Sequence, residues 1–200
     1  MILVTGGTGL VGCHLLLKLV KENDRVFALK RSTSNIEIVK KVFSFYSKND
    51  LKLFGNIKWI EGDLNDIESL SDAFKNITEV YHCAAFISFD SRDLKSMQKI
   101  NVEGTANIVN CAIDFKVKKF CYVSTIAAIG LSTNKLTDEN TEWMDNKNPY
   151  SITKKDAEME VWRGISEGLN AVIVNPGVIV GSGFWKRGSG AFFTQISRGM

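Results

Sequence analysis

Residues 1–12 of the chain, MILVTGGTGLVG, decide its fold. The opening apolar residues predict a short buried strand. Three glycines follow at three-residue spacing, Gly6, Gly9 and Gly12, and the last of them lies at the start of a helix-periodic stretch. Glycine permits a tight turn and a close approach of the backbone to a phosphate, while a helix N-terminus offers free N–H groups. This stretch therefore predicts a strand–turn–helix unit that binds a dinucleotide; a purely structural turn is the alternative.

The rest of the chain alternates short apolar runs with longer helical patterns. Hydrophobic periodicity predicts strands at 2–4, 26–29, 57–60, 80–83, 120–123 and 171–174, and helices at 10–20, 35–46, 66–74, 95–113 and 149–167. Asn65 is the expected cap of the third helix, and Pro149 opens the last one. Strands that are apolar throughout and alternate with helices indicate a parallel sheet covered on both faces. We therefore predict a doubly wound α/β fold of the Rossmann type.

Composition limits the classes of protein to consider. The chain has 200 residues, 44% of them hydrophobic and 24% charged, which suits one soluble globular domain. The net charge of +3 is scattered rather than clustered, so no nucleic-acid partner is expected. No basic leader precedes the first strand, and no apolar run approaches about 18 residues. We expect no signal peptide and no membrane association, and hence a cytoplasmic location.

Cysteine and histidine usage gives no sign of a metal site. The four cysteines form no CxxC pair, and three of them lie in apolar runs, which is typical of reduced buried thiols. His82 lies in an apolar strand and His14 in the first helix, so both are interpreted as structural. Because no His/Cys/Asp cluster has ligand spacing, no metal is expected.

The end of the chain suggests a second region. After Gly181 the sequence becomes rich in glycine and aromatic residues, and it stops at Met200 as another helix begins. We expect residues 1–180 to form the dinucleotide-binding catalytic domain and residues 181–200 to start a truncated substrate-binding region. The polar stretch 131–148 is longer than a usual connection and is expected to be a functional loop, with Trp143 and Met144 offering apolar contacts.

The end of the second strand bears on the choice of cofactor. An acidic residue there would accept hydrogen bonds from the adenosine ribose, but this chain has Lys30 and Arg31 instead. An arginine can pair with a ribose 2′-phosphate. The sequence therefore favours NADP(H) over NAD(H). The alternative is that Lys30 and Arg31 are a solvated turn.

Two further positions carry the candidate chemistry. Tyr150 and Lys154 have i, i+4 spacing, which places both side chains on one face of a helix. A lysine ammonium beside a phenol lowers the tyrosine pKa and makes it a usable general acid or base. Ser124 and Thr125 end the fifth strand, where open parallel sheets bind ligands, and either hydroxyl could hold a substrate oxygen beside Tyr150. The alternative is that these hydroxyls satisfy backbone groups.

With these features in order, the chain resembles the extended short-chain dehydrogenase/reductase family of the NAD-dependent epimerase/dehydratase superfamily. The resemblance spans nearly the whole chain. It rests on seven motifs: Thr5-Gly-Gly-Thr-Gly-Leu-Val-Gly12, Gly62-Asp-Leu64, Tyr81-His-Cys-Ala-Ala85, Asn101-Val-Glu-Gly-Thr105, Val123-Ser-Thr125, Tyr150-Ser-Ile-Thr-Lys154 and Asn175-Pro-Gly177.

The resemblance implies roles for particular residues. The residues expected to contact the cofactor are Gly6, Gly9, Leu10, Val11 and Gly12 at the pyrophosphate, Lys30 and Arg31 at the ribose phosphate, Asp63 and Leu64 at the adenine, and Ala84, Ala85, Tyr150, Lys154, Pro176 and Val178 toward the nicotinamide. The implied catalytic set is Thr125, Tyr150 and Lys154, with Ser124 as the alternative hydroxyl and Asn101 helping to position Lys154.

Two departures from the family pattern favour its reductase branch. Ile129-Gly130 stands where epimerases and dehydratases often have Tyr-Gly, and no acid follows the second strand. The chain therefore resembles dihydroflavonol reductases and hydroxysteroid dehydrogenases. An NADP(H)-dependent oxidoreductase acting on a small carbonyl or alcohol is the leading hypothesis. The alternatives are a nucleotide-sugar epimerase or dehydratase with tightly bound NAD, and a non-catalytic NADP(H) sensor. The resemblance also implies a homodimer formed by the helices at 95–113 and 149–167.

Overall fold

Six parallel strands form the centre of the computed structural model, which describes residues 1–200 except 131–137, 139, 142–147, 186–187 and 200. The strands are β1 (Ile2–Thr5), β2 (Val26–Lys30), β3 (Ile57–Glu61), β4 (Glu79–His82), β5 (Lys119–Val123) and β6 (Ala171–Val174). Their order across the sheet is β3-β2-β1-β4-β5-β6, and every neighbouring pair is parallel. The order reverses between β1 and β4, so the carboxyl ends of these two strands flank a crevice. The predicted Rossmann-type fold is confirmed.

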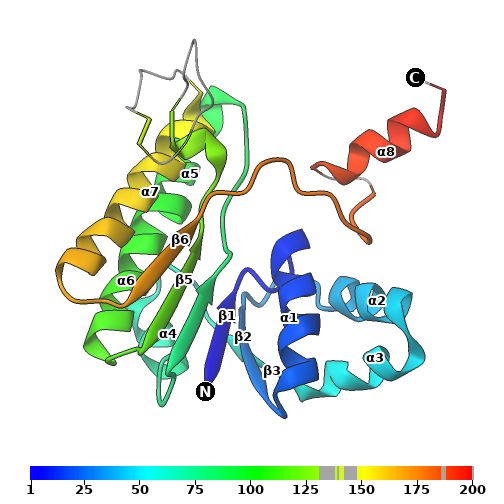
Figure 1. The fold of residues 1–200 in the computed structure, drawn as a ribbon, viewed down its shortest axis with the longest axis horizontal. Coiled ribbons are helices and arrows are strands. Elements are labelled where there is room, and N and C mark those ends of the chain that lie inside the picture. Colours follow the sequence, from blue (N-terminus) through cyan, green and yellow to red (C-terminus); the bar gives the residue numbers. More distant parts are fainter. Residues whose placement is uncertain (131–137, 139, 142–147, 186–187, 200) are drawn as a thin grey trace.

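Helices lie on both sides of this sheet (Figure 1). They are α1 (Leu10–Glu22), α2 (Glu37–Tyr46), α3 (Lys48–Leu53), α4 (Ile67–Ala73), α5 (Leu94–Met97), α6 (Gly104–Asp114), α7 (Pro149–Ser166) and α8 (Gly190–Ile196). Helices α1 to α3 cover the β1–β3 half from one side, and α4 to α7 cover the opposite face (Figure 1). A π-helical segment, Gln98–Glu103, joins α5 to α6.

A separate apolar core fills each side of the sheet. On the α1 side, Leu16 and Phe43 pack fully buried against Val4 and Ala28 of the central strands. The α2 sequence places Val39, Val42 and Phe43 on one face, which explains why a short, strongly amphipathic segment is held as a helix. On the other side the core residues come mainly from β4, β5, α6 and α7. The two cores fix the strand ends on which the candidate site is built.

The structure corrects three sequence expectations. The cap of α4 is Asp66 rather than Asn65, because the Asp66 carboxylate accepts from the backbone N–H groups of Glu68 and Ser69. The helix expected at 95–113 contains the π-helical turn rather than running as one α-helix. The sheet is not covered throughout, since Val172 and Val174 of the edge strand β6 are 55% and 42% exposed.

The remaining predicted strands and helices begin and end within two residues of their predicted bounds. Short helix α3 has no buried residue and no apolar periodicity long enough to predict it. Most of the expected functional loop, including Trp143 and Met144, lies outside the described residues. Within the described parts of the chain, no helix combines the length and apolar character needed to cross a membrane.

Candidate functional site

The glycine turn after β1 forms a backbone cradle at the N-terminus of α1. Gly6 has a φ of +68°, and a Cβ on it would lie 2.6 Å from the backbone nitrogen of Ala84. A Cβ on Gly12 would lie 2.2 Å from the carbonyl oxygen of Gly6. Helix α1 starts after Gly9 with no side-chain cap and no acidic residue in its first turn. Its first N–H groups, Leu10 and Val11 included, are therefore available to an anion, and the cradle fits a dinucleotide pyrophosphate.

A polar cavity of about 410 Å³ lies beyond the ends of β2 and β3. Its lining residues are Arg31, Ser32, Glu61, Gly62, Asp63, Asp66 and Ser69. Lys30 is not among these lining residues, and its ammonium forms an ion pair with the Glu61 carboxylate at 3.4 Å. Asp63 has a carboxylate oxygen that accepts from the backbone N–H of Asn65 at 2.9 Å. Arg31 and Asp63 thus meet in one cavity, as expected for residues near an adenosine.

The other predicted cofactor residues outside α7 lie in three places. Leu64 is buried and packs against Gly104, so its side chain faces the core rather than the cavity. Ala84 and Ala85 follow β4 directly beside the glycine turn, and the Ala84 N–H donates to Thr5 Oγ1 at 3.3 Å. Pro176 and Val178 follow β6, where the Pro176 carbonyl accepts from the backbone N–H of Ile126 at 3.0 Å. Val178 is 86% exposed.

Tyr150 and Thr125 come together at the carboxyl end of β5. Asn148 caps α7 by accepting from the Tyr150 backbone N–H at 2.9 Å, and Pro149 occupies the first helical turn. At this start of α7 the Thr125 side chain is close enough to Tyr150 to interact with its hydroxyl. Burial raises the pKa of Tyr150, and the interaction with Thr125 partly offsets the effect. The phenol therefore stays protonated at neutral pH.

Lys154 lies one turn after Tyr150 and is almost fully buried. Its ammonium donates to Tyr122 Oη at 2.6 Å and to the Val123 carbonyl at 3.0 Å. Burial lowers the pKa of Lys154 to about 7, against the opposing effect of the Glu158 carboxylate. The expectation that Lys154 lowers the Tyr150 pKa is wrong for this structure, because desolvation dominates at Tyr150 and the described hydrogen bonds of Lys154 go to β5.

The two neighbouring hydroxyls at the end of β5 have different partners. Ser124 donates to Glu158 Oε2 at 2.6 Å, and Asn175 donates to the same oxygen at 2.9 Å. Thr125 faces Tyr150 and also accepts from the Ala127 N–H at 3.2 Å. The geometry therefore pairs Thr125, not Ser124, with the tyrosine. Sequence reasoning missed Glu158, whose i+4 spacing from Lys154 was the available signal.

Asn101 connects the loop after β4 to α7. Its amide accepts from the Phe86 N–H at 2.7 Å and donates to the Phe86 carbonyl at 3.0 Å. The same amide donates to Thr153 Oγ1 at 3.2 Å, on the residue preceding Lys154. Asn101 is itself buried in the π-helical segment. Its described hydrogen bonds thus reach the residue before Lys154 and do not include the lysine itself.

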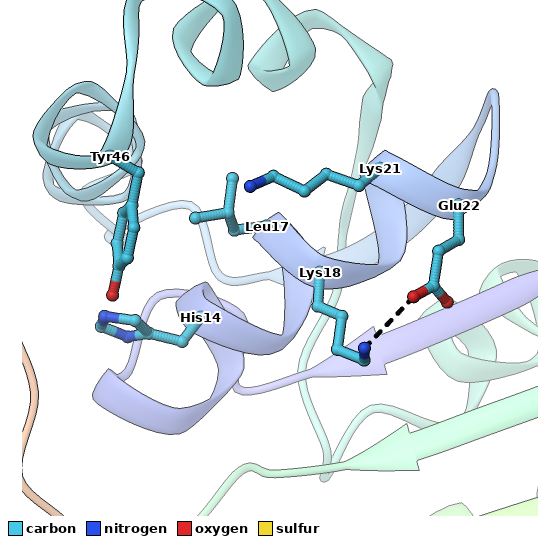
Figure 2. Close-up of a pocket in the computed structure, with 6 residues that line it drawn as sticks. All are labelled: His14, Leu17, Lys18, Lys21, Glu22 and Tyr46. Atoms are coloured by element: carbon cyan, nitrogen blue, oxygen red, sulfur yellow. Dashed lines mark ion pairs between the residues drawn. The ribbon is translucent and has the colours of Figure 1, made fainter.

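The two histidines differ in their surroundings. His82 is fully buried, with Nδ1 2.6 Å from Thr5 Oγ1 and Nε2 3.0 Å from Thr105 Oγ1. Burial lowers its pKa to about 3, so the ring is neutral. His14 lies on the outer face of α1, where its Nδ1 lies 2.7 Å from the Leu10 carbonyl and its ring meets the Tyr46 ring edge-on. Figure 2 shows His14 and Tyr46 among the residues that line a cavity of about 350 Å³ along α1.

Comparison with known proteins identifies the family of the chain. The model of the NAD dependent epimerase/dehydratase family matches residues 2–200. A Synechocystis sp. protein provisionally named dihydroflavonol 4-reductase is 32% identical over 181 residues, 89% of this chain and 49% of its own length. The UDP-glucose 4-epimerase of Vibrio cholerae is 29% identical over 207 residues, 100% of this chain and 57% of its own length. This chain thus spans about half the length of these curated relatives.

Solved structures agree on the fold. The crystal structure of gox2253 superposes with a TM-score of 0.80 at 32% identity, covering 96% of this chain and 56% of that one. A dTDP-glucose 4,6-dehydratase of Streptomyces venezuelae, solved with NAD bound, gives a TM-score of 0.82 at 23% identity over 99% of this chain and 62% of that one. The chain belongs to the NAD dependent epimerase/dehydratase family.

Proposed function

We propose that the chain is the cofactor-binding and catalytic part of an NADP(H)-dependent oxidoreductase that acts on a small carbonyl or alcohol. The observation that carries this proposal is the position of Thr125 and Tyr150 beside each other at the carboxyl end of β5, at the same edge of the sheet as the glycine cradle. Open α/β sheets bind their ligands along this edge. The cradle and the hydroxyl pair would then serve the two ends of one dinucleotide.

The chain's own side chains supply the acid chemistry of the proposed reaction. When bound, the nicotinamide supplies the hydride. Tyr150 donates its proton to the oxygen that becomes the alcohol, and burial, which raises its pKa, keeps this proton on the phenol at neutral pH. Thr125 offers a second hydrogen bond to that oxygen and stabilises charge as it develops. Lys154 places a positive charge one helical turn from Tyr150. By resemblance to the family, it would also hold the nicotinamide ribose.

This role for Tyr150 can be tested by removing one oxygen atom. Tyr150→Phe should reduce NADPH-dependent reduction of a panel of small aldehydes and ketones by about a hundredfold or more, the usual contribution of a general acid. Affinity for NADPH, measured by nicotinamide fluorescence, should change little. Tyr46→Phe is the control, because Tyr46 is 52% exposed on α2. Turnover in Tyr150→Phe equal to that of the unaltered chain would rule out the proposed acid.

Preference for NADP(H) rests on Arg31. Arg31 lines the cavity at the end of β2, where its guanidinium could pair with a 2′-phosphate, and Lys30 is engaged by Glu61. Arg31→Ala should weaken NADPH binding at least tenfold and leave NADH binding nearly unchanged. Arg25→Ala is the matched control, because Arg25 is an exposed arginine just before the other end of β2. Tighter binding of NADH than NADPH by the unaltered chain would contradict the preference.

An epimerase or dehydratase is the second candidate. It is favoured by relatives with those names, among them the Vibrio cholerae UDP-glucose 4-epimerase. Such an enzyme returns the hydride to its substrate and keeps its cofactor. Purified chain that carries a nicotinamide nucleotide through dialysis would support this candidate, whereas nucleotide-free chain that binds and releases NADPH would support the reductase.

We also propose that the chain forms a homodimer through α6 and α7. Met159 and Trp162 lie on α7 at i, i+3 spacing and are 55% and 50% exposed, which gives this helix an apolar outer face. Sedimentation should show a dimer that Trp162→Glu dissociates. A monomer at all concentrations would contradict this proposal.

A further inference from the structure

A chain of buried polar side chains runs from Lys154 to the strand that carries the glycine turn. The Lys154 ammonium donates to the Tyr122 hydroxyl at 2.6 Å, and Thr105 is the other side chain close enough to interact with this hydroxyl and favour its ionised form. Thr105 Oγ1 lies 3.0 Å from His82 Nε2, and His82 Nδ1 lies 2.6 Å from Thr5 Oγ1. All five residues are buried. Three strands and two helices contribute to this one chain, and Thr5 directly precedes Gly6.

The side chains also pack face to face. His82 and Tyr122 are register partners on β4 and β5, and their rings stack with centroids 5.5 Å apart. Lys154 Nζ lies 4.2 Å from the centre of the Tyr122 ring. Tyr122 thus meets Lys154 through both its hydroxyl oxygen and its ring, a geometry that favours the charged amine. The sequence motifs alone gave no role to Tyr122 or Thr105.

The donor and acceptor at each step can be worked out from chemistry. A lysine ammonium has only donors, so Tyr122 Oη accepts from Lys154. The phenol proton must then reach the other described partner, Thr105 Oγ1. Thr105 in turn gives its own proton to His82 Nε2, so a neutral His82 carries its proton on Nδ1 and donates to Thr5. In the reverse direction the Tyr122 proton would have no acceptor among the described residues, which is costly for a buried group.

We propose that Tyr122 is a positioning residue for Lys154, held by a directed hydrogen-bond chain through Thr105 to His82 in its Nδ1–H tautomer. The chain fixes where the ammonium lies at the end of β5, one helical turn from Tyr150. The reason for positioning Lys154 rests on the proposed function. The contacts themselves do not depend on which reaction the protein catalyses.

Several titratable groups surround the lysine and enter any measurement of it. Glu158 follows Lys154 by one turn on α7 and favours its charged form. Cys83, after β4, is close enough to interact, and burial raises the pKa of its thiol to about 12. His82 stays neutral because burial lowers its pKa to about 3. Among Lys154, His82 and Cys83, Lys154 is therefore the group whose pKa lies near neutral pH.

The first test determines the direction of these hydrogen bonds in the unaltered protein. Nitrogen-15 NMR shifts distinguish a protonated from an unprotonated ring nitrogen, and the chain has only two histidines, so His14→Gln assigns the spectrum. The expected result at pH 7 is a neutral His82 with its proton on Nδ1. A proton on Nε2, or a charged ring, would overturn the proposal. This test needs no substitution in the chain of hydrogen bonds.

The second test measures the pKa of Lys154. The pKa of Lys154 is followed through the NMR signals of its side chain, identified by their loss in Lys154→Met. Tyr122→Phe removes only the accepting oxygen and should lower that pKa by roughly one to two units, the value of a hydrogen bond to a charged group. Tyr81→Phe is the control, because Tyr81 is on β4 and points to the opposite face of the sheet from His82.

An unchanged Lys154 pKa in folded Tyr122→Phe would overturn the proposal. If that variant does not fold, the tautomer of His82 still decides the outcome. Neither readout involves a substrate or a nucleotide, so failure of the oxidoreductase proposal would leave both results intact. Conversely, loss of turnover in Tyr150→Phe together with an Nε2–H tautomer of His82 would retain the proposed function and reject only the role of Tyr122.

Discussion

Substituting Gly12 tests the nucleotide cradle most sharply. The ideal Cβ of an alanine at this position would lie 2.2 Å from the Gly6 carbonyl oxygen, where real Cβ contacts stay above 3.0 Å, so the turn would have to open by about 0.8 Å. Overpacking of this kind costs about 1–3 kcal/mol. Alanine recovers about 1 kcal/mol of helix propensity in α1, so the net loss of stability should be about 0–2 kcal/mol.

The effect on nucleotide binding should exceed the effect on folding. Opening the turn by this amount would remove at least one backbone N–H bond to a charged phosphate, worth about 1.5–3 kcal/mol, and hence about a 10- to 100-fold loss of affinity for NADPH. The assay is a fluorescence titration beside a urea unfolding curve. Gly55→Ala is the matched control, because a Cβ there meets nothing within 4 Å. Unchanged NADPH affinity in folded Gly12→Ala would refute the assignment of the cradle.

Three further predictions concern stability. Asp66→Ala should destabilise the chain by about 0.5–2 kcal/mol in urea unfolding, since it removes the α4 cap; no change would contradict the capping role. The unaltered chain should lose stability as pH falls from 6.5 to 5, by at most about 1.4 kcal/mol per unit, because the unfolded state protonates His82 and the folded state, with a pKa of about 3, does not. His82→Gln should remove this slope and His14→Gln should keep it; equal slopes in both variants would be inconsistent with the buried neutral ring. Phe43→Ala should cost about 3–5 kcal/mol, whereas Phe45→Ala, 46% exposed on the same helix, should cost about 0.5 kcal/mol or less; similar losses would argue against the described core.

Much of this architecture could be predicted from local sequence. Each strand is a short, mostly apolar run, and helices α1, α2 and α6 each have an apolar face, so the order of elements could be predicted. The α4 cap was misplaced by one residue because Asn65 and Asp66 are both good capping residues, and only the backbone path decides between them. The π-helical turn was not predicted, since its i→i+5 bonding leaves no distinct hydrophobic period.

The sequence offered candidate residues for the site but could not predict the contacts that they make in the fold. Sequence order places Thr125 and Tyr150 on successive elements, and the strand end brings them together. The environment of Lys154 depended on tertiary packing: its hydrogen bonds go to Tyr122 and to a β5 carbonyl, which no spacing rule indicates. A lowered pKa was expected for Tyr150 because the charge of the nearby lysine was considered and the cost of burying a phenolate was not.

Titration of the purified chain with NADPH and with NADH, each followed by nicotinamide fluorescence, tests the central claim most directly. The account predicts saturable binding of one nucleotide per chain, tighter for NADPH, and displacement by a 2′-phosphorylated adenosine diphosphate that occupies only the cradle and the Arg31 cavity. Absence of saturable binding for both nucleotides would contradict the account at its base.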